Sequence, residues 1–219
     1  MIVLPATVEV EITTKCTLAC PMCARTLDPD ETTQRWKYGE MPVETFEKFL
    51  SQLPEEVNRM SFCSAFGDAI YHTKLKSILD LCKKYNKSID LYTNGSYRDA
   101  AWWEEISSRL GADDAITFSV DGLEDTNKIY RVNADWPSIV TGMKVIGENK
   151  LVRKRWKWIL FRHNQDQVID GFLLSKELGI DEFLLIESGR LKPDMAPTVA
   201  YTDILTKLSM AKEEYETKS

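Results

Sequence analysis

The sequence EITTKCTLACPMC at residues 11–23 places three cysteines, Cys16, Cys20 and Cys23, within eight positions. The chain has five cysteines in all, and the other two stand alone and far from this group. An odd number of cysteines with three of them clustered is a poor disulfide framework and favours a metal site. Three thiolates are one ligand short of a closed tetrahedral zinc site, whereas they can hold a four-iron cluster with one iron left open.

The composition is that of an ordinary globular protein of one main domain. The chain has 219 residues, 43% of them hydrophobic, and its 28 Lys and Arg against 34 Asp and Glu give a net charge of −6. Nucleic-acid binders usually carry a basic surplus, so we expect no nucleic-acid partner. The sequence offers no apolar run long enough to cross a bilayer, and residues 1–5 lack the regions of a secretory signal. We therefore expect a cytoplasmic protein with no membrane partner.

Around the cysteines, hydrophobic periodicity predicts strands that alternate with helices. The predicted strands cover residues 7–13, 60–64, 88–93, 115–120, 155–161 and 182–187. The predicted helices between them cover residues 43–53, 75–85, 99–110, 137–148 and 165–178, and a last helix covers 201–215. Strict alternation implies right-handed crossovers and a parallel sheet, either doubly wound or closed towards a barrel.

Polar residues at alternate positions of several strands favour the barrel. They are Glu9, Glu11 and Thr13, then Asp90, Tyr92 and Asn94, then Thr117, Ser119 and Asp121. Strands of an open parallel sheet are apolar on both faces because helices cover both, so a polar face has to line a cavity. We predict an α/β protein, a partial (β/α)6 TIM-like barrel of parallel strands over residues 1–190. A tail over 191–219 carries one helix that covers the barrel edge or contacts substrate.

The C-x3-C-x2-C spacing, together with the residues before it, resembles the radical S-adenosylmethionine (radical SAM) enzymes, over roughly residues 6–188. The resemblance implies that Cys16, Cys20 and Cys23 hold a [4Fe-4S] cluster and that S-adenosylmethionine (SAM) chelates its open iron. An electron donor such as flavodoxin or ferredoxin then drives SAM cleavage to a 5′-deoxyadenosyl radical. In such barrels the chemistry sits at the carboxyl ends of the strands, which is where the cysteine loop follows the first strand.

Further segments that match the family's motifs imply contacts to SAM. Residues 66–69 stand where the family has G-G-E-P, residues 92–95 contain T-N-G, and residues 119–122 read S-x-D-G. An arginine follows about ten residues later, and Met22 takes the place of an aromatic residue beside adenine. The SAM contacts implied in this way are Met22, Gly67, Asp68, Asn94, Ser119 and Arg131, the last as a bidentate partner for the SAM carboxylate.

Several other residues near the predicted mouth have two interpretations. His163 is a proton donor or an ordinary loop histidine, and Cys63 is a buried thiol or a thiol that quenches a radical. Arg162, Asn164, Glu187 and Ser188 end strands and are expected to face the mouth. The long polar loop at residues 28–39 is expected to cover the cluster or to contact substrate.

These observations predict an iron–sulfur enzyme of oxidoreductase or transferase type that abstracts hydrogen from a peptide or small-molecule substrate. Two alternatives remain: an activating enzyme for a partner protein, and a non-catalytic iron–sulfur or zinc module. The nearest-looking branch often carries a C-terminal domain with auxiliary clusters. No cysteine follows Cys82, so we expect no auxiliary cluster here, and we expect no preceding cobalamin domain because the barrel begins by residue 7.

Overall fold

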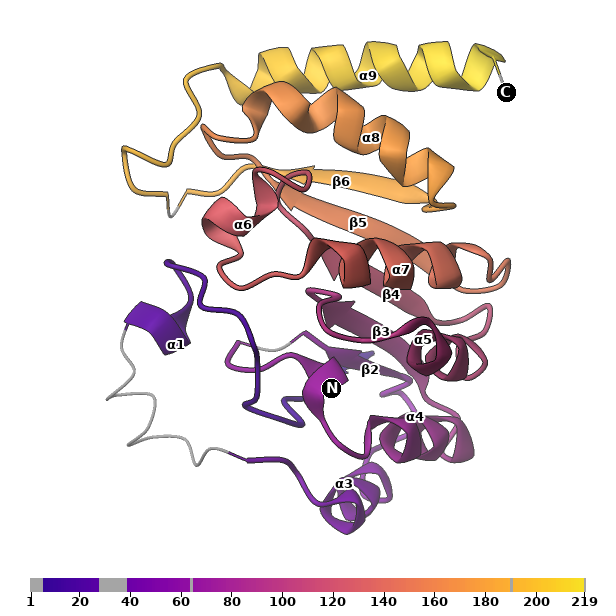
Figure 1. Cartoon of the computed structure of the whole chain (residues 1–219). Coiled ribbons are helices and arrows are strands. Elements are labelled where there is room, and N and C mark those ends of the chain that lie inside the picture. The colour runs from indigo at the N-terminus through magenta and orange to yellow at the C-terminus, as the bar shows by residue number, and fades with distance from the viewer. Residues whose placement is uncertain (1–5, 28–38, 64, 190, 219) are drawn as a thin grey trace, which may run out of the picture.

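The computed structural model describes residues 6–27, 39–63, 65–189 and 191–218. Its centre is one sheet of six parallel strands in sequence order (Figure 1). The strands are β1 (Thr7–Glu9), β2 (Arg59–Phe62), β3 (Ser88–Thr93), β4 (Ala115–Ser119), β5 (Arg153–Ile159) and β6 (Glu182–Ile186). No pairing joins the described residues of β1 to those of β6, so the barrel stays open between them. The predicted partial barrel is confirmed.

Helices follow the strands and cover one face of the sheet (Figure 1). They are α3 (Val43–Leu50), α4 (Leu75–Lys84), α5 (Ala100–Ser107), α7 (Trp136–Gly147) and α8 (Val168–Glu177). Asp99 caps the start of α5, because its carboxylate accepts the Trp102 N–H at 2.8 Å. Gly179 follows the end of α8 and has a positive φ of 72°, which glycine adopts readily. These boundaries lie within three residues of the predicted ones, and at the start of α8 a short 3-10 turn, η2 (Gln165–Gln167), takes the place of the first predicted turn.

Three short elements escaped the sequence prediction. They are α1 (Ala24–Leu27), the 3-10 turn η1 (Ala69–Tyr71) and α6 (Asn127–Tyr130). Each has three or four residues, which is too short to show a helical hydrophobic period. All three lie in segments that follow the cysteines or a strand, and so they shape the carboxyl-end rim of the barrel.

The first strand is shorter than predicted. It ends at Glu9, and only the Val10 N–H continues towards β2, donating to the Ser61 carbonyl at 2.9 Å. Farther on, Thr13 pairs with Glu40 in an isolated antiparallel bridge. The prediction of a strand to Thr13 was wrong because the alternating polar pattern continues through residues that pair with other segments.

Strand β5 shows how sequence alternation sorts the two faces. Trp156 and Trp158 point to the helix side and are completely buried. Arg155 and Lys157 alternate with them and point into the barrel, where both are half-buried. The apolar face of β5 packs in the hydrophobic core, and the charged face lines the interior of the barrel. This is the pattern expected of a strand with one face in contact with solvent.

The segment after β6 ends in helix α9 (Tyr201–Lys218), which packs along the outer side of α8 (Figure 1). Ile204 and Leu208 are buried in this contact, and the Tyr201 hydroxyl donates to the Leu185 carbonyl of edge strand β6 at 2.8 Å. Whether α9 has a role beyond this packing stays a prediction. None of the helices in the described ranges is long and apolar enough to cross a membrane.

Candidate functional site

A cavity of about 230 Å³ lies between the cysteine loop and the inner face of the sheet. Cys16, Cys20 and Cys23 line it, together with five of the six predicted SAM contacts. Those five are Gly67, Asp68, Asn94, Ser119 and Arg131. Met22 is not among the lining residues and instead packs beside the buried cluster of Leu18, Cys20, Tyr130 and Phe161. Segments more than 100 residues apart in sequence thus meet in one place.

The three thiols belong to a loop that is tied to the opposite side of the cavity. The Ala19 N–H donates to the Val132 carbonyl at 3.1 Å, and the Cys23 N–H donates to the Cys20 carbonyl at 3.0 Å. Burial raises the pKa of Cys16 to about 11 and also raises the pKa of Cys20. The Cys16 and Cys20 thiols therefore hold their protons at neutral pH in the absence of a metal, and a bound metal has to displace these protons.

Three cysteine thiols that line one cavity are the donor set that a four-iron cluster with one open iron requires. In the described part of the chain, no three Cys, His, Asp or Glu side chains converge where one metal ion could bind. A [4Fe-4S] cluster does not need such convergence, because each thiolate binds a different iron. None of the three cysteines is in a disulfide. The residues present fit the cluster that the motif implies.

Asp68 organises the loops beside the thiols. Its Oδ2 accepts from the Asn94 backbone N–H at 2.7 Å, from Asn94 Nδ2 at 2.6 Å and from the Thr93 hydroxyl at 3.1 Å. Its Oδ1 accepts from the Ile70 N–H at 3.2 Å. Asn94 Nδ2 also lies 3.6 Å from the Cys16 sulfur. Burial raises the pKa of Asp68 to about 6 despite these bonds. Both carboxylate oxygens are committed within the protein, so Asp68 acts on the site by orienting Asn94.

Glu11 is a positioning residue that the sequence analysis did not identify. Its Oε1 accepts the backbone N–H groups of Phe66 and Gly67 at 2.8 and 2.7 Å. Gly67 has no room for a side chain, since a Cβ there would lie 1.9 Å from the Thr13 carbonyl oxygen. The next residue, Asp68, donates its N–H to the Lys15 carbonyl at 2.9 Å. The segment 66–68 is therefore fixed against the segment that connects β1 to the cysteines.

Arg131 forms a buried ion pair with Asp121. Arg131 Nε donates to Asp121 Oδ2 at 2.6 Å, and Asp121 Oδ1 accepts the Ile159 N–H at 2.6 Å. The Asp121 side chain is fully buried, so removing its partner would leave a carboxylate without a counter-charge. Arg131 follows α6 and faces Cys20, whose pKa its charge lowers against the larger effect of burial.

Towards the sheet, the cavity is lined by Cys63, Tyr92 and Lys157, which we call the sheet end. Lys157 on β5 lies opposite Ser119 on β4 in the strand register. Below them, Arg155 Nη2 donates to Asp90 Oδ1 at 2.6 Å, and its guanidinium carbon lies 5.8 Å from the Tyr92 ring centroid. Cys63 is exposed, so the predicted buried thiol is wrong, and partial desolvation of its sulfur raises its pKa. The predicted polar interior of the barrel is thus present.

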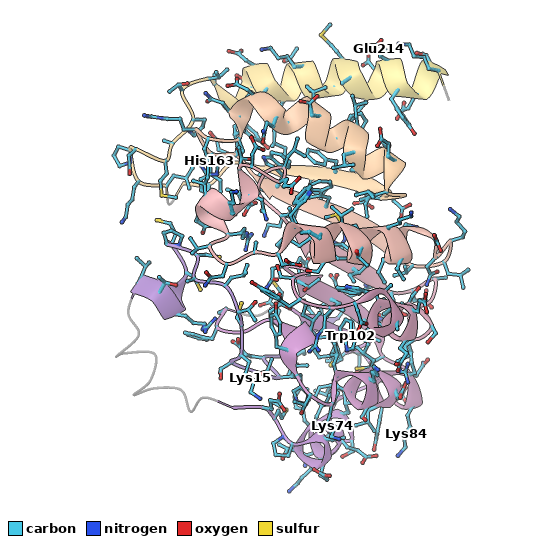
Figure 2. All side chains as sticks on the ribbon, viewed as in Figure 1. Lys15, Lys74, Lys84, Trp102, His163 and Glu214 are labelled. Atoms are coloured by element: carbon cyan, nitrogen blue, oxygen red, sulfur yellow. The ribbon has the colours of Figure 1, made fainter. Side chains whose placement is uncertain are left out.

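The remaining predicted mouth residues have other surroundings. His163, labelled in Figure 2, stacks on Phe161 with ring centroids 5.1 Å apart, and burial lowers its pKa. Arg162 donates to the Pro193 and Ala196 carbonyls at 3.1 Å and so holds the segment after β6, and Asn164 bonds backbone groups near the end of β5. Glu187 and Ser188 line a separate pocket beside that segment. Of the predicted covering loop, residues 28–38 lie outside the described residues.

Known proteins share the sequence pattern and the fold of this chain. The sequence profile of the Radical SAM superfamily matches residues 10–187. A tungsten-containing aldehyde ferredoxin oxidoreductase cofactor-modifying protein from Pyrococcus furiosus is 23% identical over 94% of this chain and 58% of its own length. The chain therefore spans less than two thirds of that curated relative.

Among solved structures, Streptococcus suis SuiB bound to S-adenosylmethionine gives a TM-score of 0.72 at 15% identity, covering 98% of this chain and 48% of SuiB. The protein anSMEcpe with bound AdoMet gives 0.70 at 17% identity, covering 93% of this chain and 57% of that one. TYW1 with a lysine–pyruvate adduct gives 0.66 at 17% identity, covering 95% of this chain and 73% of that one. At these identities the likeness shows a shared fold. Since the family profile matches most of its length, the chain belongs to the radical SAM superfamily.

Proposed function

We propose that this protein is an enzyme that cleaves SAM reductively and abstracts hydrogen from a peptide or small-molecule substrate. The observation that carries the proposal is the meeting of three cysteine thiols with residues from several strand ends in one cavity. The family implies a [4Fe-4S] cluster and SAM, and bound together they supply a 5′-deoxyadenosyl radical. Cys16, Cys20 and Cys23 are the ligands we assign to the cluster. A flavodoxin or ferredoxin is the reductant that we expect.

The chain's own residues would bind SAM from three sides. Glu11 fixes the backbone at Gly67, and Gly67 lines the cavity where we place the methionyl amino group. Asn94, held by Asp68 beside Cys16, is placed for the methionyl group or the ribose. Ser119 and Arg131 line the other side and would take the carboxylate. Arg131 has five N–H donors, of which the bond to Asp121 uses the one at Nε.

Met22 has the weakest support among the proposed SAM contacts, because it packs outside the cavity. The Met22 thioether is polarizable and suited to contact adenine. Such a contact would require SAM to extend beyond the residues that line the cavity. Substituting Met22 by Ala therefore tests whether adenine lies on that side.

Relatives with the same fold support a peptide or a small molecule as substrate. One SuiB structure is bound to the precursor peptide SuiA, and one anSMEcpe structure contains AdoMet and a peptide named Cp18Cys. The Pyrococcus relative is named for modifying a cofactor. The net charge of −6 disfavours a nucleic-acid backbone on electrostatic grounds.

The proposal is tested with anaerobically reconstituted protein supplied with dithionite and SAM. We expect about four irons per chain, as a [4Fe-4S] cluster requires, a broad cluster absorption, and formation of 5′-deoxyadenosine. The Cys63→Ala protein is the matched control, because Cys63 lines the same cavity but lies outside the motif. A reconstituted cluster that yields no 5′-deoxyadenosine would contradict SAM cleavage, and a sample that binds zinc alone would favour the non-catalytic module.

A further inference from the structure

The inner face of β5 carries three cations in succession, Arg153, Arg155 and Lys157. Arg153 lies 3.7 Å from Glu182 of β6, and Arg155 lies 2.6 Å from Asp90 of β3. Lys157 is the cation nearest the carboxyl end of the strand and lines the cavity. It forms no ion pair with any carboxylate of the described residues. Two of the three positions are thus balanced by the protein itself, and the third is not.

A second observation singles out the same residue. The described cations that line the cavity are Arg25, Arg131 and Lys157. Both terminal nitrogens of Arg25 reach the Cys16 carbonyl at 3.4 Å, and Arg131 is paired with Asp121. For the Lys157 ammonium the described residues give neither a hydrogen bond nor an ion pair, although its backbone carbonyl accepts the Val120 N–H at 3.1 Å. An ammonium that lines a cavity and has no carboxylate partner can form an ion pair with an anionic group that enters the cavity.

The position of Lys157 assigns it to substrate rather than to the cluster. It lies at the sheet end of the cavity with Cys63 and Tyr92, whereas Arg25 and Arg131 lie against Cys16 and Cys20. The charges that act on Cys63 are those of Lys157, Glu9, Asp90 and Glu11. Of these acids, Asp90 is paired with Arg155, Glu11 accepts two backbone N–H groups, and Glu9 is exposed at the end of β1.

We propose that Lys157 binds an anionic group of the substrate, a carboxylate or a phosphate, and so selects for an acid-bearing substrate. That the bound anion belongs to a substrate rests on the function proposed above, whereas the anion site itself does not. The ammonium anchors one end of the substrate at the sheet, which leaves the rest of the molecule directed towards the cysteines. Lys157 thereby fixes the distance between the anchored group and the reacting carbon.

The test uses reconstituted protein with SAM bound and three probes that share one ring: phenylacetate, phenyl phosphate and phenylacetamide. Their binding is measured by saturation-transfer NMR. We expect at least one anion to bind about tenfold more tightly than the neutral amide, the equivalent of one partly desolvated ion pair. The two anionic probes distinguish a carboxylate from a phosphate site.

Substitutions then test whether Lys157 causes the preference for the anionic probe. Lys157→Gln should reduce the preference for the anion to less than about twofold, and Lys157→Arg should keep most of it because the charge remains. Lys207→Gln is the control, since Lys207 is exposed on α9. Equal binding of all three probes to the wild type, or an unchanged preference in Lys157→Gln, would overturn the proposal. So would weaker SAM binding in Lys157→Gln, because Lys157 would then serve SAM. Failure of SAM cleavage alone would overturn only the function proposed above.

Discussion

The two ends of the cavity are built differently. At the cysteine end Asp68, Asn94 and Arg131 are each bonded to other parts of the protein, and Asp68 alone accepts four hydrogen bonds. At the sheet end Lys157 has no such partner among the described residues, and Cys63 is exposed. A site whose polar groups are fixed before binding loses little free energy in ordering them. This difference supports our proposals that the pre-organised cysteine end binds the cofactors and that the sheet end binds the anionic group of a substrate.

The cysteines allow the sharpest test of this difference. Replacing Cys16, Cys20 or Cys23 by Ala should abolish both the cluster absorption and 5′-deoxyadenosine formation, because each supplies one of three protein ligands. Cys63→Ala at the sheet end should retain the iron and SAM cleavage. Iron analysis and product chromatography measure both results. Full iron content and activity in any of the first three variants would contradict the assignment of that ligand.

The two buried ion pairs provide the next largest effect. Arg131→Ala leaves Asp121 completely buried without its partner, which should lower the free energy of unfolding by about 3–5 kcal/mol. Arg155→Ala should cost less, about 1–3 kcal/mol, because the Asp90 side chain remains 14% exposed to solvent. Urea unfolding of the two variants compares them directly. An equal or reversed order would show that the cysteine end is not the more rigidly organised one.

Asp68 makes the cysteine end sensitive to pH. Its pKa is raised to about 6 from 3.8, so between these values the folded protein binds more protons than the unfolded chain does. This carboxyl therefore contributes a gain in stability as the pH falls from about 6 towards 4, on the order of 2 kcal/mol. Unfolding free energies should show this gain in the wild type relative to Asp68→Asn.

Asp80→Asn is the matched control for that experiment, because Asp80 pairs with Arg109 at the exposed surface of α4. The Asp80→Asn protein should show the same change in unfolding free energy between about pH 6 and 4 as the wild type. Identical slopes for the wild type and Asp68→Asn would mean that Asp68 has an ordinary pKa.

The smallest expected effect concerns Ser119, next to Lys157 in register. Ser119→Ala should weaken SAM binding about fivefold, the equivalent of about 1 kcal/mol for one lost hydrogen bond, with the cluster intact. Tyr92→Phe removes a hydroxyl at the sheet end and should leave SAM affinity unchanged. Titration of SAM into the two reconstituted variants measures both. If Tyr92→Phe weakens SAM binding more than Ser119→Ala does, SAM extends farther into the barrel than we assign.

The sequence predicted the barrel well because strand and helix periods are local and long enough to recognise. Strand β3, for example, covers the predicted residues 88–93. The cavity-facing positions of Asn94 and Ser119 also followed from alternation along a strand. Long-range bonds were not predictable in this way. Glu11 reaches residues 55 and 56 positions away, and nothing in its neighbourhood distinguishes it from a solvated strand residue.

Two sets of contacts at the site could not be predicted because they depend on short turns that the sequence does not reveal. The pairing of Arg131 with Asp121 requires helix α6, which is only four residues long. The four bonds to Asp68 require the turn η1 and the backbone of Asn94. A useful signal was available for Asp121, since an Asp after a buried strand and ten residues before an Arg is suited to an ion pair.

We propose that the cysteine end of the cavity holds a cluster with one iron left for SAM. Electron paramagnetic resonance of the dithionite-reduced, reconstituted protein tests it most directly when spectra are recorded with and without SAM. We expect a [4Fe-4S]⁺ signal whose g values change when SAM is added, and no such signal in the Cys20→Ala protein. A cluster signal that is identical with and without SAM would contradict the claim.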